Sequence, residues 1–593
     1  MKFNFQNYIA LAFLIMTVQV SFAQKRDGNI GSEEVTVTKS YSPTISDAIK
    51  ISETPSLDDE GNTKKESIKY SIFSFPVAST FAPLKGKAEG VEKSKQEPIY
   101  NNYATLGFGN FRTLNAELYV NQELNNNDYV GGMFRHLSSQ GGVKGVELDA
   151  DYFDTALDLT YGANYNDMSF NFDLGYKNQI YNWYGLPATF GSLQTPQDRA
   201  DLINSINPQH SFNTYSIGGR IGFGESILSD ANLKFLHFAD TFGSTENRFY
   251  AKPTFLFEVG EQAVKTDVVV DYVGGSFENN YAKTNTEAVK YGYTNIGLSP
   301  SFVMLKDDWT LNLGASIFYS FGLENAKNAL FVYPQVTASY NVVGDLMIFY
   351  AGAQGSLEQN SYQNFVDGNP FLSPTMGDNG TTGFMRPTDK QYDIFAGLKG
   401  KLANNVSYNL RASYLNEKNK ALFKSNDYNE NASNEFYAFG NSFQVVYDDM
   451  KTLSFTGDLK ASFSENVTFS IGGSVYSFKN DFQQEAWNLP TVKLDSKLDF
   501  NITQKWFAGA QVFYVGERKD LQLNTDILYL VQPDPITLDS YFDVNAHVGY
   551  KHNERLTGFL KVNNITNQNY QKWLNYPVQG LQIVVGANYK FDF

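Results

Sequence analysis

Apolar and polar residues alternate along most of the chain, from about residue 101 to its end. The final stretch shows this clearly: from Leu581 to Phe593 every odd position is apolar or aromatic, and the even positions are polar or small except Val584. Neighbouring side chains of a β-strand point to opposite faces, so such a run predicts a strand with one apolar and one wet face. Further regular runs occupy residues 309–321, 406–414, 453–463 and 542–550. One run is weak evidence, but this many in series indicate an outer-membrane β-barrel.

Turn-forming residues divide the strands by short and long connections. Short turns are expected at residues 125–128, 166–167, 225–230, 260–262, 306–308, 343–345, 404–405, 464–466, 503–504 and 553–555. Longer connections fall near residues 182–210, 276–289, 360–388, 417–437, 517–537 and 566–579. In barrels of this kind short turns face the periplasm and long loops face outside.

The strand count follows from this order of connections. If the last strand descends to the periplasm and residues 441–463 form one long strand, the count is about 22 antiparallel strands, with both barrel termini periplasmic. An even number allows closure, which leaves no unpaired edge in lipid. The final strand is expected to pair with the strand near 555–565 and with the first, near 102–110. A long soluble all-β repeat protein is the alternative fold.

The N-terminus differs from the rest of the chain. Lys2, the apolar run Tyr8–Val20 and Ser21-Phe22-Ala23 predict a secretory signal peptide over residues 1–23. A transmembrane anchor is the alternative, but the run is short for one. Residues 24–100 lack the strand pattern and are expected to form a periplasmic segment with little core of its own. The barrel is expected over residues 101–593.

Composition supports this division of the chain. Aromatic residues make up 15% and charged residues 19%, yet the mean hydropathy is negative. That combination is typical of strands in which only alternate residues meet lipid. The net charge of −16 argues against nucleic acid as a partner. The chain contains no cysteine, which excludes disulfides and thiolate metal sites.

A barrel of this size with an N-terminal periplasmic segment resembles the TonB-dependent receptor family. Residues 562–570, followed by Trp573 and Asn575-Tyr576-Pro577, are similar to the ending of that family. Residues 368–374, Gly-Asn-Pro-Phe-Leu-Ser-Pro, with Arg386-Pro387-Thr388, are similar to its long-loop motif. The resemblance covers roughly residues 101–593 and implies transport of a solute across the outer membrane. It also implies a C-terminal signal for barrel closure and assembly, formed by Tyr589, Phe591 and Phe593, which should face lipid.

The N-terminal segment departs from the family pattern. The stretch Glu33, Glu34, Val35, Thr36, Val37 and Thr38 resembles the TonB-box-like start that precedes the family's plug domain. A full plug is larger than residues 24–100 can supply, so the resemblance implies a plug that is absent or strongly reduced. Two functions stay open: a receptor-like transport barrel coupled to TonB through this stretch, and a non-transporting accessory or structural subunit of a larger outer-membrane assembly or secretion complex. An open diffusion pore is a third, because a barrel this wide leaks unless residues 24–100 or a partner fill it.

The polar residues form no recognisable catalytic or metal motif. The five histidines are scattered, and no zinc-binding or nucleophile motif appears, so neither an enzyme nor a cofactor is expected. His547 is expected on the lumen face as an ordinary polar residue. The acidic run Glu147, Asp149, Asp151 and Asp154 is placed in an outer loop. Hard oxygen ligands suit calcium, but the run lacks EF-hand spacing, and a solvated acidic loop is the preferred interpretation.

Aromatic residues stand at the mouths of two predicted long loops. They are Tyr181, Trp183 and Tyr184 in one loop, and Tyr570, Trp573 and Tyr576 in the other. They could stack on a ligand or grip a partner. The preferred alternative is an interfacial girdle, because Tyr and Trp sit well at the level of the lipid headgroups.

Overall fold

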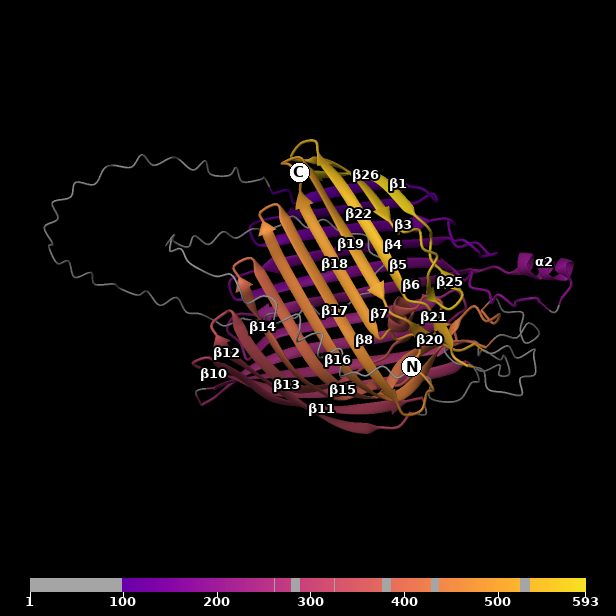
Figure 1. The fold of residues 1–593 in the computed structure, drawn as a ribbon. Coiled ribbons are helices and arrows are strands. Elements are labelled where there is room, and N and C mark those ends of the chain that lie inside the picture. The colour runs from indigo at the N-terminus through magenta and orange to yellow at the C-terminus, as the bar shows by residue number, and fades with distance from the viewer. Residues whose placement is uncertain are drawn as a thin grey trace, which may run out of the picture. The chain divides into compact units, whose positions relative to one another are not determined.

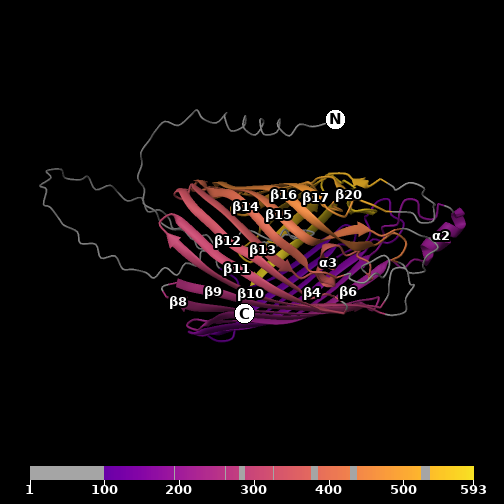
Figure 2. The same cartoon turned by 90° about the horizontal axis from the view of Figure 1, so that it is seen from below.

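The computed structural model describes residues 99–192, 194–260, 262–278, 288–324, 326–375, 385–427, 437–522 and 534–593. The predicted signal peptide, residues 24–98 and the TonB-box-like stretch Glu33–Thr38 lie outside the described residues. The described chain forms a closed antiparallel barrel of 22 strands, as the sequence predicts (Figures 1 and 2). Among the described residues, no helix is long and apolar enough to cross a membrane.

The strands follow one another around the barrel in chain order. The first half comprises β1 (Asn102–Gly109), β2 (Leu114–Glu123), β3 (Asp128–Ser139), β4 (Tyr152–Asn164), β5 (Met168–Asn182), β6 (Gln209–Phe223), β7 (Leu228–Asp240), β8 (Thr245–Val259), β9 (Gln262–Phe277), β10 (Val289–Lys306) and β11 (Trp309–Leu323). The second half comprises β12 (Ala329–Val343), β13 (Met347–Glu358), β14 (Thr388–Ala403), β15 (Val406–Ser425), β16 (Phe443–Ser464), β17 (Val467–Asn480), β18 (Val492–Asn501), β19 (Trp506–Val515), β22 (Tyr541–Lys551), β23 (Leu556–Asn563) and β26 (Gln582–Phe591).

Each predicted short turn lies between two consecutive strands at the same end of the barrel, here called the short-turn end. The other end, the long-loop end, carries the helices α2 (Pro196–Ser205) and α3 (Tyr362–Gly368) and two small hairpins, β20 (Arg518–Asp520) with β21 (Ile536–Leu538) and β24 (Gln571–Trp573) with β25 (Tyr576–Pro577). Both barrel termini lie at the short-turn end. Helix α2 reaches away from the barrel (Figure 1).

One predicted connection is misplaced. Residues 417–425 belong to β15 rather than to a loop, and the connection to β16 spans residues 426–442. The ladder resumes after a bulge between Glu417 and Lys420, and pairing continues from Lys420 to Ser425. The predicted long strand at 441–463 is confirmed as β16, which supplies the partner for this extension.

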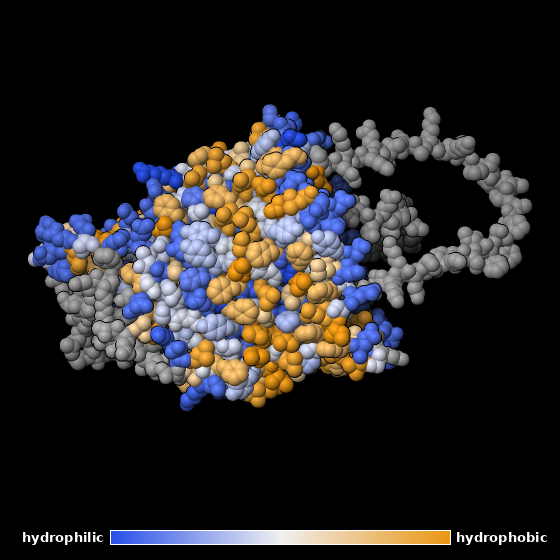
Figure 3. Space-filling model, turned by 180° about the vertical axis from the view of Figure 1, so that it is seen from behind, coloured by the Kyte–Doolittle hydropathy of each residue, from blue (hydrophilic) through white to orange (hydrophobic). Residues whose placement is uncertain are grey.

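The wall alternates between an apolar outer face and a polar inner face. On β11, outward Ile317 and Tyr319 are 46% and 39% exposed, whereas inward Ser316 and Ser320 are nearly buried. Figure 3 shows the outward residues as a broad apolar belt mixed with paler residues, with hydrophilic residues gathered toward both ends. Near the short-turn end, exposed Trp309 and Trp506 lie against tyrosines of the neighbouring strands, in the manner of an interfacial girdle.

The final strand closes the barrel as predicted. Strand β26 pairs with β1, from Asn102 opposite Phe591 to Gly109 opposite Val584, and on its other side with β23. Tyr589 lies on the exposed outer face, and Phe593 follows the end of the strand. Val584, the apolar exception among the even positions, is buried on the inner face, where it contacts the neighbouring strand at Gly107.

Candidate functional site

The first half of the connection between β13 and β14 folds into the barrel instead of away from it (Figure 2). Residues 359–375 of this connection are called the crossbar below. Ser361 caps α3, because its hydroxyl accepts a hydrogen bond from the backbone N–H of Asn364 at 3.1 Å. The helix then buries Tyr362, Phe365 and Val366, whose spacing places them on one face.

This buried face packs against two separate parts of the barrel wall. On β6 to β10 it meets a group of inward apolar residues, namely Phe212, Phe238, Val273, Phe277 and Tyr291. The ring of Tyr362 lies 5.0 Å from that of Phe277 and 5.2 Å from that of Phe238. The same cluster includes Val445 on β16, well removed around the barrel. The crossbar therefore spans the lumen at the long-loop end.

Two buried carboxylates hold Tyr362. Glu246 of β8 accepts hydrogen bonds from the Tyr362 backbone N–H at 2.6 Å, the Gln363 N–H at 3.2 Å and the Tyr291 hydroxyl at 2.7 Å. Asp240 of β7 accepts one from the Tyr362 hydroxyl at 2.8 Å. Asp240 also accepts hydrogen bonds from the backbone N–H groups of Phe242 and Ser244, and both carboxylates are shielded from water, so they depend on such donors for their stabilisation. Asp240, Glu246 and Tyr362 are called the latch.

A histidine that the sequence shows only as scattered lies beside the latch. Nε2 of His210 is 3.5 Å from Oδ2 of Asp240, and the His210 side chain is almost fully buried. Its ring packs 4.4 Å from the rings of both Trp183 and Phe212. Neither ring nitrogen has a hydrogen-bond partner within the described residues. His210 thus links the latch to the 183–208 connection by packing.

The second half of the crossbar contains the Gly368–Pro374 motif. It packs among the other connections at the long-loop end, which together are called the cap. The ring of Phe371 stacks on Tyr576 at 3.6 Å. Backbone hydrogen bonds tie the crossbar to β16: the Ser373 N–H donates to the Phe443 carbonyl at 2.8 Å, and the Phe443 N–H donates to Phe371 at 3.0 Å. The Trp183 indole donates to the Pro370 carbonyl at 3.0 Å. The motif is therefore a junction of several loops.

The structure brings the two sets of predicted loop aromatics together. Trp183 and Tyr576 are each 2% exposed and share one buried cluster, with Tyr184 5.0 Å from Tyr576. The girdle interpretation is wrong for Trp183 and Tyr576, because a girdle residue must face lipid. The ring centroids of Tyr181 and Phe371 are 6.4 Å apart, and the ring of Trp573 packs on that of Phe443. A role of these aromatics in ligand or partner contact stays a prediction.

Tyr570, the sixth of these aromatics, stacks on Tyr541 at 3.8 Å and donates a hydrogen bond to Asp543.

The sequence could not place the loop aromatics, because alternation fixes the strand faces but not the direction in which a loop folds. The one available signal for the crossbar was Tyr362, Phe365 and Val366 at helical spacing after a serine cap.

The acidic run is dispersed in the structure. Asp154 lies on β4 and not in the loop, which corrects its predicted placement. Glu147 pairs with the Arg199 guanidinium at 2.8 Å, and that hydrogen bond holds the pKa of Glu147 below its usual range. Asp151 accepts a hydrogen bond from the Gly141 N–H. Across the described residues, no three metal-ligating side chains come close enough together to hold an ion.

Asp520, in the connection after β19, is a buried acid in the cap. Its carboxylate accepts hydrogen bonds from the Asn488 side chain at 2.8 Å and the Ser425 N–H at 2.9 Å, so it joins two connections to the end of β15. Burial raises its pKa to about 6 from the usual 3.8, against these hydrogen bonds. The folded protein therefore holds this proton to a higher pH than the unfolded chain, and Asp520 weakens folding as pH rises from about 4 to about 6.

Replacing Asp520 by asparagine is expected to remove this pH dependence. Relative to Asp520→Asn, the wild type should lose up to about 3 kcal/mol as pH rises through that window, at about 1.4 kcal/mol per pKa unit. The measurement is the thermal unfolding midpoint of both proteins in detergent from pH 4 to 7.5. A difference between the two that stays constant with pH would contradict the prediction. Asp534→Asn, in the same connection, is the control.

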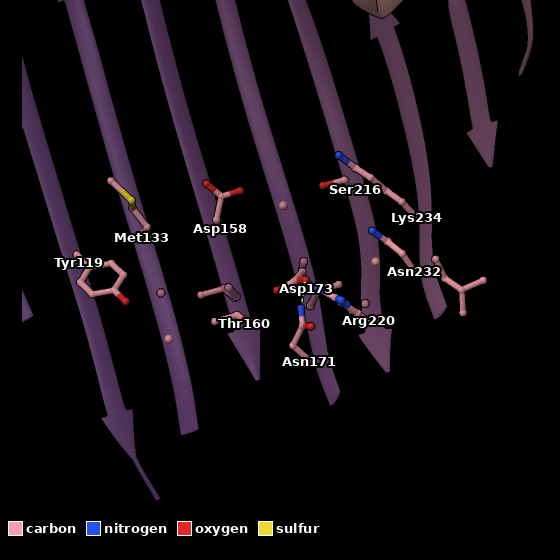
Figure 4. Close-up of a pocket in the computed structure, with 18 residues that line it drawn as sticks. Tyr119, Met133, Asp158, Thr160, Asn171, Asp173, Ser216, Arg220, Asn232 and Lys234 are labelled. Atoms are coloured by element: carbon pink, nitrogen blue, oxygen red, sulfur yellow. Dashed lines mark hydrogen bonds between the residues drawn. The ribbon is translucent and has the colours of Figure 1, made fainter. Parts of the chain in front are cut away.

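Between the crossbar and the short-turn end, the inner wall has a hollow. It lies along β2 to β7 and encloses about 570 Å³ (Figure 4). Half of its lining residues are polar or charged, among them Asp158, Asp173 and Lys234. His547, elsewhere on the inner wall, sits beside Gly509 of β19, on the lumen face as predicted.

Comparison with known proteins identifies the fold. No protein-family model and no curated protein matches the sequence. Among solved structures, the FrpB iron transporter of Neisseria meningitidis matches with a TM-score of 0.61 and 10% identity, over 84% of this chain and 82% of that one. The ferric-catecholate import receptor Fiu of E. coli K12 matches with 0.60 and 11%, over 83% and 82%.

The pyoverdine outer-membrane receptor FpvA of Pseudomonas aeruginosa PAO1 also matches, with a TM-score of 0.60 and 13% identity, over 83% of this chain and 78% of that one. At such identities the likeness shows the fold alone. The barrel of this chain has the fold of the TonB-dependent receptor barrels, and the resemblance expected from the sequence is confirmed at that level.

Proposed function

We propose that the chain is an outer-membrane transport barrel that moves a solute across that membrane, with its long-loop end outside and its termini in the periplasm. The apolar outer belt and the short turns gathered at one end support this placement. The solved structures with this fold include iron receptors and a copper transporter. Iron and copper are the cargoes of those proteins and are not assigned to this chain.

One observation carries the proposal: a wide barrel with a polar inner wall is crossed at its long-loop end by the crossbar. A barrel of 22 strands is too wide for wall side chains to fill. The crossbar is an insertion between two strands, tied to the wall at the latch and at β16, and to the β24–β25 hairpin at Tyr576. A closure made of a connecting loop can move without breaking the barrel, which is what a gate requires.

The N-terminal segment completes the proposal. Residues 24–100 act as a periplasmic, plug-derived segment, and Glu33–Thr38 act as the contact with TonB. This assignment rests on the sequence resemblance, since these residues lie outside the described part of the chain apart from Ile99 and Tyr100.

The test is solute uptake by cells. Mass spectrometry of the growth medium, with and without the full-length barrel, identifies solutes whose depletion depends on it. Deleting residues 33–38 should then reduce their uptake to the level of cells without the barrel. Deleting residues 57–62, a stretch of equal length in the same segment, should leave uptake intact. Unchanged uptake after the first deletion contradicts the TonB contact, and the lack of any dependent solute contradicts transport.

A second candidate is a non-transporting accessory or structural subunit of a larger outer-membrane assembly or secretion complex. One observation favours it: the 183–208 connection carries α2 away from the barrel, where Arg199 braces it against Glu147. Purification in gentle detergent decides between the candidates. Stoichiometric partner proteins that are lost when residues 196–205 are replaced by a short Gly-Ser linker would favour the subunit, whereas an isolated barrel would count against it.

A further inference from the structure

The hollow on the inner wall follows from the register of four neighbouring strands. In one row of paired residues, Asp173 of β5 faces Gly218 of β6, which faces Lys234 of β7. In the next row, Asp158 of β4 faces Gly175 of β5, which faces Ser216 of β6. In each row, a glycine therefore lies between two residues with polar side chains. Gly218 carries no side chain, so the wall is recessed between Asp173 and Lys234, whereas the space over Gly175 is taken by the Ser216 hydroxyl, 2.5 Å from where a Cβ atom would lie.

The charges beside the recess are not neutralised by each other. Neighbouring strands are about 4.8 Å apart, so Gly218 separates the backbones of Asp173 and Lys234 by about 10 Å. Within the described part of the chain, neither Asp173 nor Lys234 forms an ion pair, and both are exposed to the lumen. Asp173 accepts a hydrogen bond from the Asn171 amide. An acid, Asp173, and a base, Lys234, thus face the lumen on either side of Gly218.

The remaining lining supplies further hydrogen-bonding groups. Asn171 faces Arg220, which faces Asn232, in a third row beside the first. Figure 4 shows Asn171, Asp173 and Arg220 together, with Asp158 on one side and Lys234 on the other. Of the four charged residues in the lining, Asp158 pairs with Arg135 at 3.0 Å and Arg220 lies 3.7 Å from Asp230, which leaves Asp173 and Lys234 as the charges without an ion pair within the described residues. The recess therefore offers separated charges of both signs and favours neither a simple cation nor a simple anion.

We propose that this recess is a binding subsite for a zwitterionic solute of the size of a short peptide, with the solute's ammonium group at Asp173 and its carboxylate at Lys234. The inference rests on the proposed transport function and names the class of its cargo. An extended tripeptide spans about 10 Å, which matches the separation across Gly218. The hollow lies in the size range of small-ligand sites. The amides of Asn171 and Asn232 would meet the peptide groups between the two ends.

A neutral oligosaccharide fits less well. Sugar rings are held by aromatic platforms, and Tyr119 is the one aromatic residue of this lining. Its ring already stacks on Tyr103, with the centroids 5.7 Å apart. A neutral ligand would also leave the two separated charges without partners of opposite sign.

The test is calorimetric titration of the purified full chain with three probes: trialanine, its N-acetylated and C-amidated form, and maltotriose. Trialanine should bind, and the blocked peptide and maltotriose should bind at least tenfold more weakly. Asp173→Asn and Lys234→Gln should each weaken trialanine binding about tenfold. Lys497→Gln and Asp499→Asn remove a mutually paired acid and base on β18, outside the recess, and should leave binding unchanged.

The outcomes separate this inference from the proposed function. Equal binding of the blocked peptide, equal binding of maltotriose, no trialanine binding, or unchanged binding in the two recess variants would each overturn the subsite. Heat-modifiable migration on gels shows that each variant is a folded barrel. A barrel that binds trialanine in detergent but supports no uptake in cells would retain the subsite and lose the transport function. Uptake that is unchanged by Asp173→Asn and Lys234→Gln would retain the transport function and overturn the subsite.

Discussion

Replacing Glu246 by alanine is expected to release the crossbar and open the long-loop end of the barrel. The change removes the acceptor of three hydrogen bonds, from Tyr291, Tyr362 and Gln363. Bonds to a charged group each contribute roughly 1.5–3 kcal/mol, and the donors left behind lie in a buried site. A loss of roughly 4 kcal/mol in crossbar docking corresponds to about a thousandfold change in the docking equilibrium.

The measurement uses the absence of cysteine from the chain. Val366→Cys places a single thiol on the buried face of α3, where the native side chain is 2% exposed. A membrane-impermeant maleimide should label this thiol at least a hundredfold faster when Glu246 is alanine. Glu246→Gln keeps one carbonyl acceptor and should give an intermediate rate.

The control is Glu358→Gln, at the last residue of β13 and directly before the crossbar. Glu358 is about half exposed and pairs with Lys390 at 2.7 Å, and such exposed pairs contribute about 1 kcal/mol or less. Labelling should then stay at the rate of the parent. If Glu246→Ala yields a folded barrel with an unchanged labelling rate, the latch does not hold the crossbar in place.

The strands were predictable because each one carries its own evidence. Alternation in β11 or β26 is set by lipid on one side and water on the other, and short turns are marked by local Asn, Asp and Gly residues. Val584, the exception in the last strand, could not be explained in this way, because its contact on the inner face is with Gly107 of β1, at the other end of the barrel sequence. The end of β15 was missed because residues 416–420 are all polar and look like the start of a loop, and residues 420–425 pair only because β16 extends beside them.

The crossbar could not be predicted in the same way. Its sequence, with an exposed-looking Gly-Asn-Pro motif, fits an outer loop, and its inward path depends on partners far away in the chain. Glu246 lies 116 residues before Tyr362, and Tyr576 lies 205 residues after Phe371. The recess shows the same limit: Gly218 looks like an ordinary strand glycine until the register places it between Asp173 and Lys234.

Replacing Gly586 by valine is expected to prevent the barrel from closing. Gly586 of β26 faces Gly107 of β1 across the seam between the last and first strands. A Cβ atom at Gly586 would lie 2.4 Å from the Leu106 carbonyl oxygen and 2.7 Å from the Gly107 Cα. Both are backbone atoms, so the clash cannot be relieved by a side-chain rotation, and the two strands would have to separate. An open seam leaves backbone groups unpaired in lipid, at several kcal/mol each.

The readout for this seam is the fraction of protein that migrates as a heat-modifiable barrel after membrane extraction, which should fall to near zero for Gly586→Val. Gly558→Val is the matched control, one strand away on β23, because a Cβ atom there has only the Gly586 carbonyl oxygen nearby, at 3.9 Å. That variant should assemble at the level of the parent. Gly586→Ala should fail almost as completely as valine, since the first added carbon already makes the clash. Normal assembly of both Gly586 variants would show that the β1–β26 seam tolerates a wider strand spacing than its pairing indicates.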